Sequence, residues 1–127
     1  MLQTIQPATT APSEAATVSK AVIAAADRLG VSARQLAGVL GLSEASISRM
    51  KKREFQLERG TKPFELALIF IRLFRSLDAI TGGDEAVAQQ WLRSPNTALA
   101  GVPLDKISSI SGITDVLAYL DARRALV

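Results

Sequence analysis

The stretch from Lys62 to Thr81 predicts a long helix that is apolar on two sides, and this feature constrains the fold most. Proline is favoured at the start of a helix, as in Lys62–Pro63, and Gly82–Gly83 closes the stretch. A helix that is apolar on two sides must bury both. One stripe is expected to face the region around Trp91, and the other either the helix-turn-helix that precedes it or a second copy of the chain. The stripes are Leu66, Phe70, Leu73, Leu77 and Ile80, and Phe64, Ala67, Leu68, Ile71 and Phe74. From the second stripe we assign a homodimer interface to Phe64, Leu68, Ile71 and Phe74.

Composition argues against most enzyme chemistry. The 127 residues include no Cys and no His, so the chain lacks a thiol nucleophile, the usual general base and the usual metal ligand. It also lacks a glycine-rich phosphate loop and paired carboxylates on one face. We therefore expect no enzyme activity, no cofactor and no metal.

The longest apolar run, Leu66 to Ile71, is too short to span a bilayer. No basic segment followed by an apolar one begins the sequence, so we expect no signal peptide, no membrane partner and a cytoplasmic protein.

Charge is distributed unevenly along the chain. Residues 1–62 contain nine Lys/Arg and five Asp/Glu, a net charge of +4, whereas residues 63–127 contain six and seven, a net charge of −1. A basic half is suited to bind a polyanion, so the other half is expected to have a different task.

Residues 1–16 are rich in Thr, Ala, Pro, Ser and Gln and show no periodic apolar face, so we interpret them as a flexible arm. The arm carries no Lys or Arg, which favours an unstructured terminus over a second contact with DNA. The first predicted helix runs from Thr17 to Leu29 and ends at Gly30. Its apolar face consists of Val18, Val22, Ala25, Ala26 and Leu29.

Residues 32–52 predict a helix-turn-helix. Ser32 is placed to cap a helix over residues 33–40, Gly41 supplies the turn, and Ser43 is placed to cap a second helix over residues 44–52. The small Ala37 falls where the two helices cross. An ordinary helical hairpin is the alternative, but several positional rules coincide here. The inward positions are Leu36, Leu40, Leu42, Ile47 and Met50.

The second helix of this pair is expected to enter the major groove of DNA. Arg49 is suited to a bidentate pair with guanine, Glu44 to a cytosine amino group and Ala45 to a thymine methyl. Directly after such a helix, a run of positive charges favours phosphate contact over a merely solvated face. The predicted DNA-binding residues are Gln35, Ser43, Glu44, Ala45, Ser46, Arg49, Lys51, Lys52 and Arg53.

The segment Asp84–Ile107 contains the only tryptophan, Trp91. Asp84 and Glu85 favour the start of a helix, and Pro95 stops it. A turn and a short helix from Leu104 follow. Trp91 is either an anchor buried in its own domain or part of a functional surface.

After this segment we expect a loop over residues 108–112, a last helix that carries Ile113, Val116, Leu117 and Leu120, and an exposed tail from Asp121 to Val127 that is separable from the core.

The sequence GDEAVAQQWLRSPNTALAGVPLDKI resembles the segment shared by Xre/MbcA/ParS-type antitoxins, in which a "GD…A..WL.SPN.AL.G..PL" phrase precedes the final helix. The helix-turn-helix resembles the Xre/Cro-like repressor version. The resemblance implies an all-α fold, with an N-terminal helix-turn-helix domain and a small C-terminal helical toxin-binding domain. The expected parts are the arm over 1–16, the DNA-binding domain over 17–60 and a dimerisation and toxin-binding domain over 61–127.

The resemblance also implies a type II antitoxin that blocks a cognate toxin and, as a homodimer on operator DNA, represses its own operon. The common toxin partner in the family has a RES domain, an enzyme that destroys cellular NAD. The alternative is a stand-alone Xre/Cro-like regulator whose C-terminal half only dimerises, and a neighbouring toxin gene would distinguish the two. The implied toxin-binding residues are Trp91, Arg93, Ser94, Asn96, Tyr119, Asp121, Arg123 and Arg124.

Overall fold

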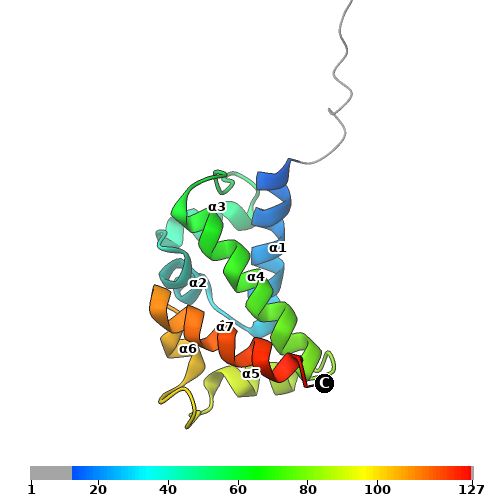
Figure 1. Cartoon of the computed structure of the whole chain (residues 1–127). Helices are drawn as coiled ribbons and strands as arrows, with labels where there is room; N and C mark the ends of the chain where they lie inside the picture. The colour runs from blue at the N-terminus through cyan, green and yellow to red at the C-terminus, as the bar shows by residue number, and fades with distance from the viewer. Residues whose placement is uncertain (1–12, 127) are drawn as a thin grey trace, which may run out of the picture.

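The computed structural model describes residues 13–126 and places seven α-helices in that range (Figure 1). They are α1 (Glu14–Leu29), α2 (Ala33–Leu40), α3 (Glu44–Lys51), α4 (Lys62–Ile80), α5 (Glu85–Arg93), α6 (Pro103–Lys106) and α7 (Ile110–Arg124). Residues 13–126 form no strand, and their one β-type pairing is an isolated bridge between Asn96 and Gly101. The predicted all-α fold is confirmed. Within the same range, no helix combines the length and the apolar character that crossing a membrane requires.

Capping side chains fix where six of these helices begin. The side-chain oxygen of the residue before each helix accepts a hydrogen bond from a first-turn amide that has no partner within the helix. Because Ser13 caps α1, the helix starts at Glu14 and not at the predicted Thr17. Residues 1–12 of the predicted arm lie outside the described residues. The six caps are Ser13, Ser32, Ser43, Thr61, Asp84 and Ser109.

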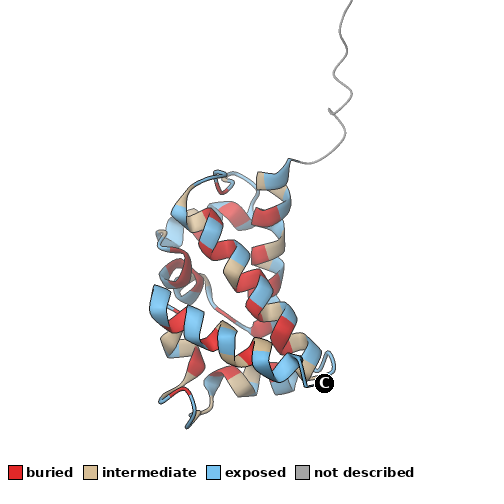
Figure 2. Ribbon diagram, viewed as in Figure 1, coloured by how far each residue is buried: buried red, intermediate tan, exposed pale blue. Residues whose placement is uncertain are grey.

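Helix α4 is the centre of the fold. It packs against α1 on one side and against α7 on another, and buried positions follow it along most of its length (Figure 2). Phe70, Leu73 and Leu77 have no exposed surface at all. The buried side chains of all the longer helices join in one continuous cluster, so the core is not divided between the two halves of the chain.

The two-sided burial predicted for α4 is confirmed, and it affects the residues assigned to a dimer interface. Phe64 and Ile71 are buried inside this chain, and Phe74 is half-buried beneath the guanidinium of Arg28. Leu68 is 45% exposed and faces outward. The second apolar stripe is therefore used mainly to pack α4 within its own chain.

The loop predicted over residues 108–112 is wrong, because α7 already begins at Ile110. The hydroxyl of Ser109 accepts a hydrogen bond from the amide of Gly112 at 3.0 Å and so caps the helix. Gly112 is buried in the first turn of α7, where an added Cβ would overlap the carbonyl group of Lys106 at the end of α6. This glycine thus permits a close approach of two backbones and does not mark a loop.

We expect Gly112→Ala to lower the free energy of unfolding by about 1–3 kcal/mol, because α7 must move away from Lys106 to admit the methyl group. Ser111→Ala is the matched control, since Ser111 is exposed in the same helical turn. Urea titrations of both variants measure the effect. Equal midpoints for the two variants would contradict the close approach.

Candidate functional site

Helices α2 and α3 form the predicted helix-turn-helix. Gly41 between them has a φ of 71°, in the left-handed region, and its amide bonds to the carbonyl of Ala37. The residues predicted to point inward do so: Leu42 is half-buried, and the others, Leu36, Leu40, Ile47 and Met50, are buried. The pair of helices is thus held together by apolar packing, and the outer face of α3 does not contribute to the core.

Gln35, one of the predicted DNA-binding residues, helps to fix the start of α2. Its side-chain oxygen accepts a hydrogen bond from the Ser32 amide at 2.9 Å, and the Ser32 hydroxyl accepts one from the Gln35 amide at 3.1 Å. This capping box leaves the side-chain NH₂ group of Gln35 as its donor toward other molecules.

The outer face of α3 presents most of the predicted base-reading residues. Glu44, Ala45 and Arg49 are exposed on it. The hydroxyl of Ser43 caps the helix and also donates to the hydroxyl of Ser46 at 2.9 Å. The guanidinium of Arg49 in turn donates to the Ser46 hydroxyl at 3.2 Å and lies 5.8 Å from the centre of the Phe55 ring. These contacts order the Arg49 side chain before any ligand arrives.

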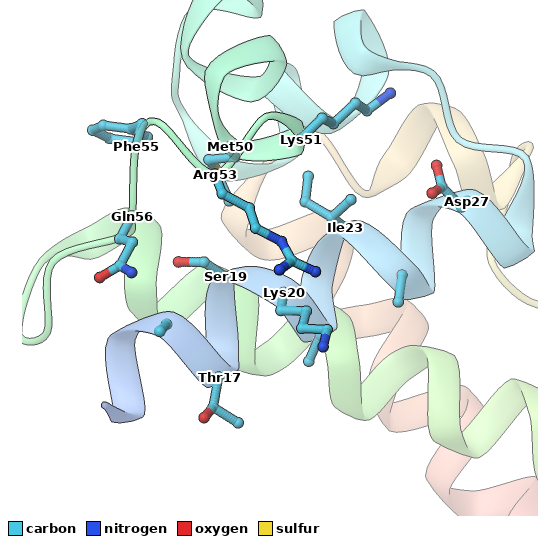
Figure 3. Close-up of a pocket in the computed structure, with 13 residues that line it drawn as sticks. Thr17, Ser19, Lys20, Ile23, Asp27, Met50, Lys51, Arg53, Phe55 and Gln56 are labelled. Atoms are coloured by element: carbon cyan, nitrogen blue, oxygen red, sulfur yellow. The ribbon is translucent and has the colours of Figure 1, made fainter. Parts of the chain in front are cut away.

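The basic run continues past the end of α3. Lys51, Lys52 and Arg53 are all exposed. Arg53 has a φ of 63°, so the chain reverses there in the left-handed conformation, which residues other than glycine rarely adopt. Lys51 and Arg53 line a surface groove between α1 and the segment after α3, and Lys20 of α1 lines its other wall (Figure 3). The cationic surface therefore extends from α3 to α1.

A second cluster of side chains lies where α5 meets α7, and we call Trp91, Tyr119 and Arg123 the aromatic cluster. The Trp91 and Tyr119 rings are stacked with centres 6.1 Å apart, and the Arg123 guanidinium lies 5.1 Å from the centre of the Tyr119 ring. Both rings are half-buried, and Arg123 is exposed. Trp91 is thus neither fully buried in the core nor fully exposed to solvent. Val87, one helical turn before it, is 47% exposed.

Three other predicted toxin-binding residues have hydrogen-bond partners inside the chain. Arg93 donates to the carbonyls of Leu29 and Gly30 at the end of α1, at 3.1 and 2.7 Å. The Ser94 hydroxyl donates to the Gln90 carbonyl, and the Asn96 side chain accepts from the Leu99 amide. These contacts give the three residues structural tasks.

The expectation that the tail from Asp121 is separable from the core is wrong. Asp121 belongs to α7 and accepts hydrogen bonds from Arg72 at 2.7 Å and from Ser76 at 2.8 Å, which tie α7 to α4. Arg124 also reaches the Ser76 hydroxyl, at 3.5 Å. Of the described tail, Leu126 is 83% exposed, and Val127 lies outside the described residues.

A polar junction between α1 and α5 was not predicted from the sequence. Arg28 pairs with Glu85 at 3.1 Å and with Asp78 at 3.6 Å. The Gln89 side chain donates to the Arg28 carbonyl at 3.0 Å. Gln89 and Arg93 therefore supply donors to the last carbonyls of α1, while Glu85 and Asp78 pair with the Arg28 side chain. No local pattern could have revealed a junction whose members are so distant in sequence.

This geometry defines a helix-turn-helix protein with a C-terminal helical domain joined to it through α4. A family model of the antitoxin Xre-like helix-turn-helix domain matches residues 9–72, and a model of the antitoxin Xre/MbcA/ParS C-terminal toxin-binding domain matches residues 76–125. The first alone covers half of the chain, so the protein belongs to the Xre-like antitoxins, with a DNA-binding domain followed by a toxin-binding domain. A comparison with curated protein sequences gives no match.

We expect Arg93→Ala to lower the free energy of unfolding by about 1–2 kcal/mol, because the last carbonyls of α1 lose their charged donor. The exposed Arg75 of α4 supplies the control, and Arg75→Ala should change stability by less than about 0.5 kcal/mol. Thermal and urea unfolding measure both. Equal, small effects would show that the junction adds nothing to the fold.

Proposed function

We propose that this antitoxin neutralises a RES-domain toxin that degrades NAD and represses its own operon as a homodimer. The observation that carries the proposal is the separation of two exposed surfaces on a chain with one continuous core. The first surface is the basic end of the helix-turn-helix, and the second is the aromatic cluster at α5 and α7. The identity of the toxin rests on the family resemblance.

The DNA-binding role rests on α3 and the residues after it. The exposed side chains of Glu44, Ala45 and Arg49 are of the types that read base edges in the major groove. Lys51, Lys52 and Arg53 extend the same surface with charges suited to phosphates. In a dimer, two such helices would lie roughly 34 Å apart, one turn of DNA, on a near-palindromic operator.

The toxin-binding role rests on the aromatic cluster. Trp, Tyr and Arg are the residues that contribute most often to binding hot spots, because they combine large apolar area with directional polar groups. The stacked rings and the Arg123 guanidinium are fixed in advance, so little side-chain entropy is lost on binding. We infer that the toxin covers this cluster and that inhibition results from steric occlusion of the toxin's entrance.

The dimer contact must use surface that the fold leaves free. Phe64 and Ile71 are already buried within the chain, so a contact through α4 would depend on Leu68 and on the exposed edge of Phe74.

We expect Arg49→Ala to weaken operator binding by about 1–3 kcal/mol and to relax the preference at one base pair, because a bidentate pair with guanine is lost. Lys52→Ala should instead weaken all sequences alike and lower the salt dependence by about one phosphate contact. Fluorescence anisotropy at several salt concentrations separates the two effects. An unchanged operator affinity in Arg49→Ala would mean that α3 does not read the operator through this residue.

A reciprocal pair of charge reversals tests the separation of the two roles. Arg123→Glu should weaken toxin binding about 30-fold or more, as expected for a hot-spot residue, and should leave operator binding intact. Lys52→Glu, the matched control, should weaken operator binding at least as much as Lys52→Ala does and should keep neutralisation. Both side chains are exposed, so both variants should fold.

Growth rescue in cells that express the neighbouring gene, beside a promoter-binding shift, gives both readouts, and cellular NAD reports the toxin's activity. If Arg123→Glu still rescues growth and co-purifies fully with the toxin, the toxin does not bind the aromatic cluster. If expression of the toxin leaves NAD unchanged, the RES assignment is wrong.

A further inference from the structure

The Arg49 side chain is held from two directions, although it lies on the exposed face of α3. On one side its Nη2 atom donates to the Ser46 hydroxyl at 3.2 Å. On the other its guanidinium carbon lies 5.8 Å from the centre of the Phe55 ring, within the range of a cation–π contact. An arginine has five N–H donors, so the bond to Ser46 leaves enough for a bidentate pair with a base.

The contact with Ser46 is itself part of a short chain of hydrogen bonds along α3. The Ser43 hydroxyl accepts from the Ser46 amide at 3.1 Å and donates to the Ser46 hydroxyl oxygen at 2.9 Å. The Ser46 oxygen therefore receives two donors, one from Ser43 and one from Arg49. Because Ser43 is fixed by its role as the helix cap, these hydrogen bonds hold the Ser46 hydroxyl in place, and the Ser46 hydroxyl in turn positions the Arg49 guanidinium.

Phe55 reaches Arg49 only because the chain reverses at the end of α3. Arg53 lies in the left-handed region, with a φ of 63°, and the Glu54 amide bonds back to the Arg49 carbonyl at 2.8 Å. A non-glycine residue in this region costs about 1–2 kcal/mol. The reversal brings Phe55 back against α3, where its half-buried ring lines the groove with Met50 (Figure 3).

We propose that Phe55 and Ser46 are positioning residues that fix Arg49 for reading one base pair. The inference rests on the proposed function, because it assumes that Arg49 contacts the operator. A free arginine side chain loses up to roughly 2 kcal/mol of rotamer entropy when it is fixed. Here the ring orients the guanidinium and Ser46 holds one of its ends, so part of that loss has occurred before DNA binds. Phe55 is thus a determinant of specificity that touches no base.

The operator is first selected by the unmutated full chain from a pool of randomised DNA duplexes. The test then compares binding to this operator with binding to duplexes that carry each of the other base pairs at the position that Arg49 reads. Phe55→Leu keeps an apolar side chain in the groove but removes the ring. We expect it to reduce the preference for the favoured base pair about 2- to 5-fold, the size of an exposed cation–π contact. Binding to duplexes of unrelated sequence and the salt dependence should not change, and Phe55→Trp should restore the preference.

A double-mutant cycle separates positioning from a general structural effect. In an Arg49→Ala background, Phe55→Leu should no longer change the preference for the favoured base pair. The effect of Ser46→Ala on that preference should also be smaller in this background than in the unmutated chain. Ser46→Ala also keeps the test valid if Phe55→Leu fails to fold, which melting temperatures will show.

The proposal is overturned if Phe55→Leu weakens all duplexes alike, or if its effect on the preference persists without Arg49. A different result, in which Arg49→Ala leaves operator preference unchanged, would overturn the assigned role of α3 and the inference with it.

Discussion

The fold depends on the burial of α4 on two sides. An isolated helix with this pattern would expose two apolar stripes to water, and each large side chain removed from water contributes about 1.5–3 kcal/mol. Helix α1 covers one side and α7 another, so Phe70, Leu73 and Leu77 are fully enclosed. The boundary between the two family domains falls within α4, between residues 72 and 76. The two domains of this antitoxin therefore share their central helix.

The polar junction at the end of α1 connects the C-terminal helix α5 to the N-terminal half of the chain. Arg93 and Gln89 of α5 donate to the last carbonyls of α1, and Gly30 then leads within two residues to the cap of α2. The junction thus links the helix that carries Trp91 to the start of the helix-turn-helix. Helices α3 and α5 lie at opposite ends of the molecule (Figure 1). This arrangement is consistent with simultaneous access of DNA and a partner protein to one antitoxin chain.

Features that act within a few residues could be predicted from the sequence, and long-range features could not. Ser32, Gly41 and Ser43 set the helix-turn-helix boundaries through local caps, and the family phrase around Trp91 indicated the C-terminal domain. The bond of Arg93 to Leu29 spans 64 residues, and that of Asp121 to Arg72 spans 49. No rule of sequence spacing predicts partners at such separations, so the hydrogen bonds that Arg93 and Asp121 make within the fold were not predicted. Gly112 was misread because a glycine that admits a neighbouring backbone resembles one that marks a loop.

Hydrogen exchange of the unbound full chain tests the shared core most directly. Backbone amides in the middle of α1, α4 and α7, such as those of Val22, Leu73 and Val116, are buried in the same cluster. If the core is one unit, these amides exchange only through global opening and report the same free energy. Amides of α7 that open several kcal/mol more easily than those of α1 would contradict the account and show two independently folded domains.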